Sequence, residues 1–168
     1  MPTTRYSFAS AVVNEKIVVI GGAYGEKDYS SVVEEYNPVT NTWESKSPLP
    51  FECAEGTAST LNGKIYFMGG CLDNINASTH IYDPQLDSWT IGAAMNYSRY
   101  GHSSEVVGGK IYVMGGYSGS EALNVVEEYD PLMDQWTDRA SMAVARYRFS
   151  TALVNDKIFV FGGYSGVF

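Results

Sequence analysis

The apolar positions of the chain gather in short runs, and each run ends at a pair of glycines. Two of these runs are residues 17–20 (IVVI) and residues 111–114 (IYVM). Their β-branched and aromatic residues are typical of β-strands, and no window carries a convincing helical period. The glycine pairs stand at 21–22, 69–70, 115–116 and 162–163. The chain therefore repeats one β-rich unit about every 47 residues.

A tyrosine and a tryptophan recur in step with the glycines. Each tryptophan follows its tyrosine by seven residues, in the couples Tyr36 and Trp43, Tyr82 and Trp89, and Tyr129 and Trp136. The distance from each tryptophan to the next glycine pair is constant at 26 residues, whereas the stretch between a glycine pair and the next tyrosine varies from 13 to 15. Variable length marks a surface loop, because loops tolerate insertions and packed strands do not.

Each unit is predicted to contain four strands, which we name A to D in chain order. A two-residue corner turns strand A, for example residues 100–107, into strand B, which ends at the glycine pair. These corners are residues 14–15, 62–63, 108–109 and 155–156. Strand C runs into the tyrosine, and strand D carries the tryptophan. The Asp-Pro step between C and D is turn chemistry, so Asp83 and Asp130 are not expected to be catalytic.

These residues carry a family resemblance. The succession of residues 110–116 (KIYVMGG), residues 125–131 (VVEEYDP) and Trp136 resembles the Kelch repeat, and the resemblance covers nearly the whole chain. It implies an all-β fold, a Kelch-type β-propeller whose four-stranded antiparallel blades stand around a central channel. Residues 1–168 would form a single partial propeller of about three and a half blades. Repeat 1 is about 3–46, repeat 2 about 51–92, repeat 3 about 97–139 and the half repeat 4 about 145–164.

The predicted ring is incomplete, and open sheet edges pair with any available strand. Met1 stands four residues before Arg5, as Met95 stands before Arg99, so the first residue falls in the phase of the repeat. We therefore expect a piece of a longer propeller, or two copies that complete one ring between them. In the second case the chain self-associates through its open blade edges.

Composition narrows the choice of partners and of compartment. The formal net charge of −8 disfavours binding to nucleic acid or to anionic membranes, because both need a basic surface. No apolar stretch approaches the about 20 residues that span a bilayer, and no signal peptide precedes the first strand. A cytoplasmic location is the expectation.

A small basic and aromatic cluster is the candidate binding site. Counting outward from the corners sets Arg99 opposite Tyr117 and Arg146 opposite Tyr164. A guanidinium beside a phenol can stack on it and can bind a carboxylate through two hydrogen bonds. The resemblance to Kelch-like substrate adaptors implies that residues at matching positions grip acidic peptide segments. The candidate partner-binding residues are Arg5, Arg99, Tyr117, Arg146, Arg148 and Tyr164.

The alternative for these arginines is structural: each would pair with a backbone carbonyl or a neighbouring acid and tie one blade to the next. Arg148 is the favoured functional residue, because no other repeat has a basic residue at its position. Repeat 2 departs from the pattern, with Cys53 and Glu55 in place of basic residues.

Cys53 and Cys71 fall opposite each other by the same count. Their sulfurs would lie within bonding reach, but in a reducing cytoplasm we expect two thiols, with a disulfide as the alternative. No metal or cofactor is expected, because the two histidines, His80 and His102, occupy different strands and do not converge.

Two pairs of adjacent glutamates, residues 34–35 and 127–128, are expected to be structural rather than an acid/base site. Neighbouring residues on a strand point to opposite faces. One carboxylate of each pair is therefore expected in solvent, while the other ties a loop.

The sequence favours a non-catalytic module that binds a segment of a partner protein through the loop and channel face. Within the Kelch-like family such modules often act as substrate adaptors. One alternative is a fragment of a propeller enzyme, an oxidase or a sugar-modifying enzyme, since fold alone does not decide function. Another is a truncated or designed repeat protein with no activity of its own, which would explain the regular repeats.

Overall fold

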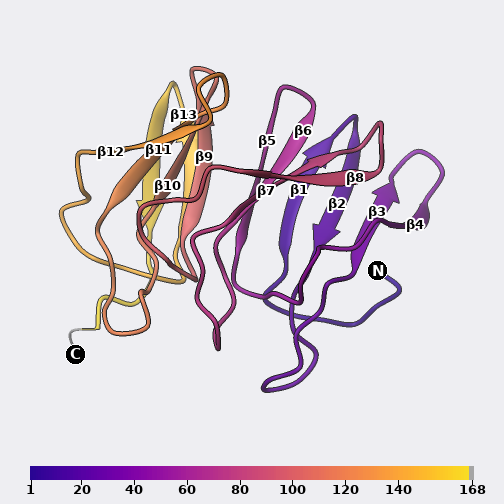
Figure 1. Ribbon diagram of the computed structural model, residues 1–168, viewed down its shortest axis with the longest axis horizontal. Helices are drawn as coiled ribbons and strands as arrows, with labels where there is room; N and C mark the ends of the chain where they lie inside the picture. The colour runs from indigo at the N-terminus through magenta and orange to yellow at the C-terminus, as the bar shows by residue number, and fades with distance from the viewer. Residues whose placement is uncertain (167–168) are drawn as a thin grey trace.

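The computed structural model describes residues 1–166 as an all-β protein (Figure 1). Its strands form three four-stranded antiparallel sheets and one two-stranded sheet. Within each sheet the strand order follows the chain, so every sheet is a meander of hairpins. This architecture confirms the prediction of a partial propeller with three and a half blades. No helix within the described residues is long and apolar enough to cross a membrane.

The four blades use strands of equal length at equivalent places in the repeat. Blade 1 holds β1 (Ala9–Val13), β2 (Lys16–Ile20), β3 (Val33–Asn37) and β4 (Thr42–Lys46). Blade 2 holds β5 (Thr57–Leu61), β6 (Lys64–Met68), β7 (Thr79–Asp83) and β8 (Ser88–Gly92). Blade 3 holds β9 (Ser103–Val107), β10 (Lys110–Met114), β11 (Val126–Asp130) and β12 (Gln135–Arg139). The half blade 4 holds β13 (Ser150–Val154) and β14 (Lys157–Phe161).

The first strand of each blade is the innermost one. Strand β1 contacts β5, β5 contacts β9, and β9 contacts β13, while the second strands β6 and β10 touch the first strand of the preceding blade less extensively. Figure 1 shows the blades following one another from the N-terminus, at the right, to the C-terminus, at the lower left. The two termini therefore lie at opposite ends of the row of blades.

The corners between the first two strands of each blade adopt the conformation that their residues favour. Both corner residues have positive φ, for example 51° and 62° at Asn14 and Glu15, and 58° and 77° at Gly108 and Gly109. This is the backbone of a type I′ turn, whose twist matches that of the strands it joins. The predicted two-residue corners are thus confirmed.

The tyrosine and tryptophan couples occupy equivalent places in the three full blades. In each couple the ring centroids are 5.0 Å apart. In blade 3 the Tyr129 hydroxyl donates to Asp134 at 2.7 Å, and the Trp136 indole donates to the Ala93 carbonyl at 2.9 Å. Because Ala93 follows the last strand of blade 2, this corner fastens the linker that arrives from the preceding blade.

The glycine pairs join each blade to the next one. The second glycine donates its backbone N–H to a carbonyl of the following blade: Gly22 to Cys53, Gly70 to Arg99 and Gly116 to Arg146, at 2.8 to 2.9 Å. The first glycine leaves room for that carbonyl, since a Cβ on Gly115 would lie 2.6 Å from the oxygen of Arg146. The apolar core likewise lies between blades, with one cluster shared by blades 1 and 2 and another by blades 2 and 3.

We predict that Gly115→Ala destabilises the protein more than Gly162→Ala does. The two glycines have φ values of 61° and 69°, but a Cβ on Gly162 would meet no described atom within 4 Å. Positive φ costs an alanine roughly 1–2 kcal/mol at either site, and the clash with the next blade adds about 1–3 kcal/mol at Gly115 alone. Urea unfolding followed by tryptophan fluorescence measures both. Equal losses for the two variants would refute the role given to the glycine pair.

Candidate functional site

The register of the inner hairpins differs by one residue from the predicted one. The corner at Gly108 and Gly109 pairs Val107 with Lys110, and counting outward from that pair brings Tyr100, not Arg99, opposite Tyr117. In the half blade, Tyr147 rather than Arg146 lies opposite Tyr164. A slip of one residue moves a side chain to the other face of a strand. The predicted pairs of Arg99 with Tyr117 and of Arg146 with Tyr164 are therefore wrong.

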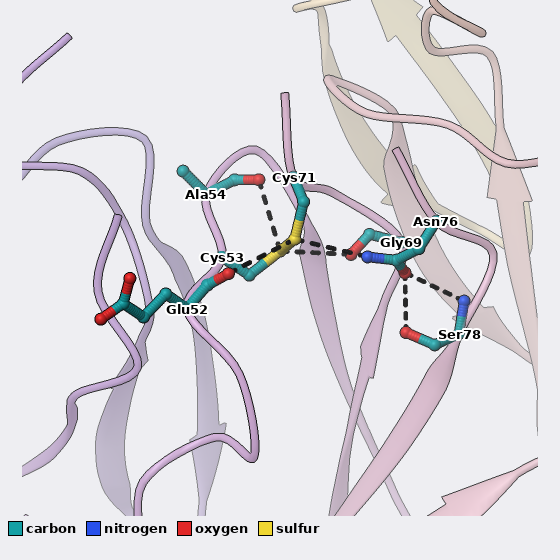
Figure 2. The surroundings of a disulfide bond; sticks show 7 residues. All are labelled: Glu52, Cys53, Ala54, Gly69, Cys71, Asn76 and Ser78. Atoms are coloured by element: carbon teal, nitrogen blue, oxygen red, sulfur yellow. Dashed lines mark hydrogen bonds between the residues drawn. A yellow bond between two sulfur atoms is a disulfide. The ribbon is translucent and has the colours of Figure 1, made fainter. Parts of the chain in front are cut away.

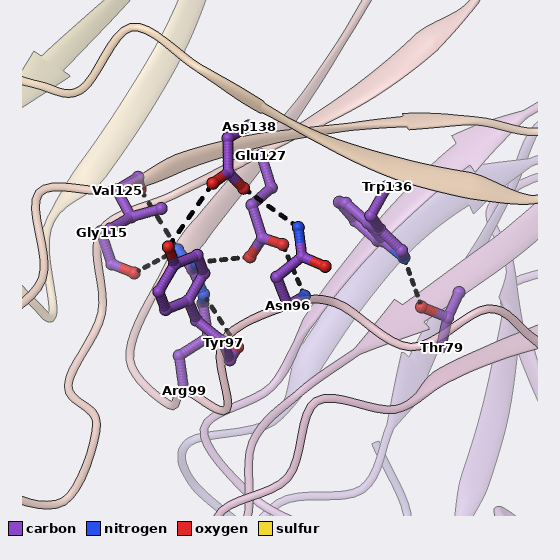
Figure 3. Close-up of polar contacts among 9 residues, drawn as sticks. All are labelled: Thr79, Asn96, Tyr97, Arg99, Gly115, Val125, Glu127, Trp136 and Asp138. Carbon is purple, nitrogen blue, oxygen red and sulfur yellow. Dashed lines mark hydrogen bonds and ion pairs between the residues drawn. The ribbon is translucent and has the colours of Figure 1, made fainter.

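Arg99 lies inside the protein, where it forms a buried ion pair (Figure 3). Its guanidinium donates to the Glu127 carboxylate at 2.5 Å, to the Gly115 carbonyl at 2.9 Å and to the Val125 carbonyl at 3.2 Å. It also lies over the ring of Tyr97, 5.8 Å from the centroid. Burial lowers the pKa of Arg99 and raises that of Glu127, while the attraction between the two charges opposes both shifts.

Arg5 repeats this arrangement in blade 1. It donates to the Glu34 carboxylate at 2.8 Å and to the Val32 carbonyl at 3.0 Å, and its side chain is fully buried. Arg146 keeps the equivalent bond to the carbonyl of Gly162, at 2.6 Å, and is only partly buried. Arg5 and Arg99 therefore have the surroundings expected of structural arginines, which pair with a backbone carbonyl and a neighbouring acid. Neither guanidinium faces solvent.

Tyrosines, instead of arginines, form the rim of the inner hairpins. The rings of Tyr100, Tyr117, Tyr147 and Tyr164 follow one another across blade 3 and the half blade, with successive centroids 5.1 to 5.6 Å apart. Tyr6 holds the matching place in blade 1, and both Tyr6 and Tyr164 are more than half exposed. We call these five residues the tyrosine rim. The rim carries the phenol hydroxyls and ring faces of these tyrosines.

The sequence contained a signal for Tyr6, Tyr100 and Tyr147 that the predicted site left out. Each follows directly after one of the repeated arginines, in the dipeptides 5–6, 99–100 and 146–147. Adjacent residues on extended backbone point to opposite sides. One residue of each dipeptide faces inward: Arg5 and Arg99 meet a buried carboxylate there, whereas Arg146 reaches only the Gly162 carbonyl.

Four residues with left-handed backbone are joined in series by three hydrogen bonds beside the tyrosine rim. They are Ser7, Glu55, Gly101 and Arg148, and their φ values lie between 50° and 61°. The N–H of each later residue donates to the carbonyl of the residue one blade earlier, at 2.6 to 2.9 Å. This series of bonds aligns the inner ends of all four blades and fixes where the side chains of Glu55 and Arg148 project.

Two members of this series, Arg148 of blade 4 and Glu55 of blade 2, form an ion pair. Two nitrogens of the guanidinium, Nε and Nη2, lie 3.1 Å from the carboxylate oxygens. The bond to Glu55 raises the pKa of Arg148, so the guanidinium is charged. About half of the Arg148 side chain is exposed. The pair lies in a depression of about 790 Å³ whose wall includes Tyr6 and Lys27.

The adjacent glutamates correct a further expectation, since all four carboxylates are buried. Glu34 and Glu127 receive the buried arginines, while Glu128 receives Lys110 and Arg139 on the other side of its strand. The bonds from Arg139 hold the pKa of Glu128 at about 2. Glu35 likewise receives Lys16 and Lys46, so each of the four buried carboxylates has a basic partner.

Cys53 and Cys71 form a disulfide bond in blade 2 (Figure 2), which corrects the expectation of two thiols. The sulfurs also lie near backbone carbonyls, including that of Gly69. His80 belongs to β7 of blade 2, whereas His102 precedes β9 of blade 3. Burial lowers the pKa of His102 to about 3, so this imidazole is neutral and packs as an aromatic group.

We predict that Arg99→Ala lowers the free energy of unfolding by about 3–5 kcal/mol, because it leaves the Glu127 carboxylate buried and unpaired. Arg146→Ala is the matched control. Arg146 stands at the equivalent position but pairs with no described carboxylate, so its loss is expected to cost less than about 1 kcal/mol. Urea denaturation measures both, and similar costs would contradict the structural role assigned to Arg99.

Known proteins that resemble this chain in sequence or in structure agree with the propeller fold described above. Kelch-like protein terF of Aspergillus terreus is 32% identical over 90 residues, 48% of this chain and 20% of its own length. Human Kelch-like protein 33 is 34% identical over 84 residues, 49% of this chain and 16% of its own. The matched segments thus span no more than a fifth of these relatives.

The solved structure of YjhT matches 98% of this chain and 60% of its own with a TM-score of 0.83 at 16% identity, which shows a shared fold. A family model described as the Attractin/LZTR1 β-propeller matches residues 1–168, and the chain belongs to that family of Kelch-type propellers.

Proposed function

We propose that residues 1–168 act as one non-catalytic module that binds a segment of a partner protein across the tyrosine rim. The rim itself is the observation that carries this proposal: five tyrosines from three blades converge beside the Arg148 and Glu55 pair. Tyrosine supplies a large contact area at a small cost in conformational entropy and is enriched at the energetic centres of interfaces. The kinship with Kelch-like proteins supports a role in protein interaction, such as that of a substrate adaptor.

An acidic partner segment suits the cation at this site. Glu55 occupies Nε and Nη2 of Arg148, and no described residue accepts a hydrogen bond from Nη1. An incoming carboxylate would bind that free edge of an already oriented guanidinium. Arg5 and Arg99 do not contribute to this surface, since both are buried. Arg148, Tyr117 and Tyr164 remain in the proposed site from the residues predicted by sequence, and Arg146 borders it.

An oxidase or a sugar-modifying enzyme is a weaker alternative for this chain. A copper oxidase would need histidines that converge on one metal, whereas His80 and His102 belong to different blades and both are buried. The carboxylate of Glu55, the acid beside the tyrosine rim, is already held in an ion pair with Arg148. Binding therefore fits the site better than acid/base catalysis does.

The two end blades expose apolar side chains whose counterparts in the middle blades are buried. On β14 the side chain of Phe161 is 56% exposed, whereas Met68, at the equivalent place in blade 2, is fully buried. At the other end Ile17 is 38% exposed, whereas Ile111 is fully buried. We propose that further blades of the same kind cover these faces. Two copies of a segment that already spans 60% of YjhT would exceed one ring of that curvature.

Light scattering on the purified chain tests this choice between further blades and a two-copy ring. We expect no discrete dimer, because two copies together would be longer than the YjhT chain, of which one copy already matches 60%. A uniform species of twice the 18.4 kDa chain mass would instead support self-association through the open blade edges.

The cytoplasmic location of the protein, expected from the sequence, stays a prediction. The bond between Cys53 and Cys71 weighs against it, because stable disulfides are typical of oxidising compartments.

We predict that Arg148→Ala removes the preference for acidic segments. A random peptide library displayed on phage and selected on the immobilised protein is expected to enrich aspartate and glutamate with the wild type and to lose that enrichment with the variant. Arg139→Ala is the matched control, since Arg139 is also about half exposed and also pairs with a buried glutamate, but lies on the outer strand β12. No acidic enrichment with the wild type, or equal enrichment with Arg148→Ala, would reject the proposed site.

A further inference from the structure

Blade 2 lacks the buried ion pair of its neighbours. Cys53 stands sixteen residues before its glycine pair, as Arg99 does in blade 3, so a cysteine replaces the arginine. His80 is the second residue of β7, as Glu127 is the second residue of β11, so a histidine replaces the carboxylate. Both halves of the pair are therefore exchanged together, and the cysteine turns away to bond Cys71.

A cleft of about 360 Å³ opens at this place in blade 2. This is within the usual size range of ligand pockets, roughly 300–1,000 Å³. The lining residues that matter for recognition are Tyr29, Phe51, Glu52, Asp73, Ser78 and His80. Tyr29 comes from the loop of blade 1, Phe51 and Glu52 from the linker between the blades, and the others from blade 2.

The cleft keeps two of the features that hold Arg99 in blade 3. Phe51 stands at the position of Tyr97, the ring over which the Arg99 guanidinium lies. Ser78 stands at the position of Val125, whose carbonyl accepts a hydrogen bond from Arg99. An aromatic face and a carbonyl are therefore arranged for a guanidinium that blade 2 itself does not supply.

The charge of the cleft also suits a cation. Glu52 and Asp73 are exposed at its edge, and neither pairs with a basic group among residues 1–166. No lysine or arginine lines the cleft. His80 is 94% buried, its ring lies 4.8 Å from that of Phe51, and its Nδ1 has no described hydrogen-bond partner. Burial lowers the pKa of His80, so the imidazole is neutral and does not repel a cation.

We propose that this cleft binds the guanidinium group of an arginine side chain presented by a partner protein. Phe51 stacks on the flat guanidinium, the Ser78 carbonyl accepts one N–H, and Glu52 with Asp73 supply the countercharge. Arginine fits better than lysine, because a planar cation stacks on an aromatic ring and offers donors in two directions, whereas an ammonium is a compact and strongly hydrated point charge. The cleft and the tyrosine rim share no residue, so this site does not depend on the proposed function.

The probe for a direct test is Nα-acetyl-arginine methylamide, titrated into the oxidised protein and followed by NMR chemical shifts. Its citrulline counterpart has nearly the same shape without the charge, and the lysine counterpart has the charge without the planar group. We expect the arginine probe to bind at least tenfold more tightly than either. Equal binding of citrulline or lysine, or no binding of arginine, would overturn the proposal.

Three variants locate the binding. Asp73→Asn combined with Glu52→Gln is expected to weaken arginine binding at least tenfold, while the control Glu121→Gln, an exposed carboxylate in the corresponding loop of blade 3, leaves it unchanged. The triple variant C53R/C71A/H80E rebuilds the internal ion pair, with alanine as in blade 1 at the place of Cys71. It is expected to fill the cleft and abolish binding.

The surface double variant keeps the test decisive if the triple variant does not fold. Unchanged arginine binding in Asp73→Asn with Glu52→Gln would refute the site. Arg148 does not line the cleft, so the phage-display result for Arg148→Ala tests the proposed function independently of the arginine titration.

Discussion

The fold depends on one repeated backbone contact, in which the second glycine of each pair donates its N–H to a carbonyl at the start of the next blade. A propeller blade is a small twisted sheet that cannot bury its faces alone, so it is stable only against its neighbours. The contact requires glycine at two successive positions. In blades 1 to 3 both glycines of each pair have a positive φ, and a Cβ on any of them would lie within 3.0 Å of a backbone carbonyl oxygen.

The same glycine contact between blades occurs beside different side chains in different blades. The backbone contact therefore maintains the fold, while the side chains next to it can change. In blades 1 and 3 a buried arginine reaches from the joint to a glutamate on the third strand. In blade 2 a disulfide and a histidine stand in these places and leave a cleft. Since the backbone bonds are preserved, blade 2 loses an ion pair without losing its position in the row. Such tolerance lets a repeat protein specialise one blade for binding.

The period of the chain determined most of what could be predicted. Glycine pairs, corners and tyrosine–tryptophan couples are local signals with fixed spacing, so blades and strand order followed from them. The site was harder, because it depends on which side of a strand a residue faces. A shift of one residue exchanged Arg99 for Tyr100 at the rim. The burial of Glu34 and Glu35 together was missed for a related reason: alternation along one strand does not reveal Arg5 or the lysines that reach these carboxylates from elsewhere in blade 1.

Hydrogen exchange of the glycine amides tests the central claim most directly, because the chain contains its own control. Gly22, Gly70 and Gly116 each donate to the following blade, whereas the N–H of Gly163 has no described backbone acceptor. If the joint between blades holds the fold together, NMR will show slow exchange at the first three amides and fast exchange at Gly163. Fast exchange at Gly70 and Gly116, or protection of Gly163 equal to theirs, would contradict the account.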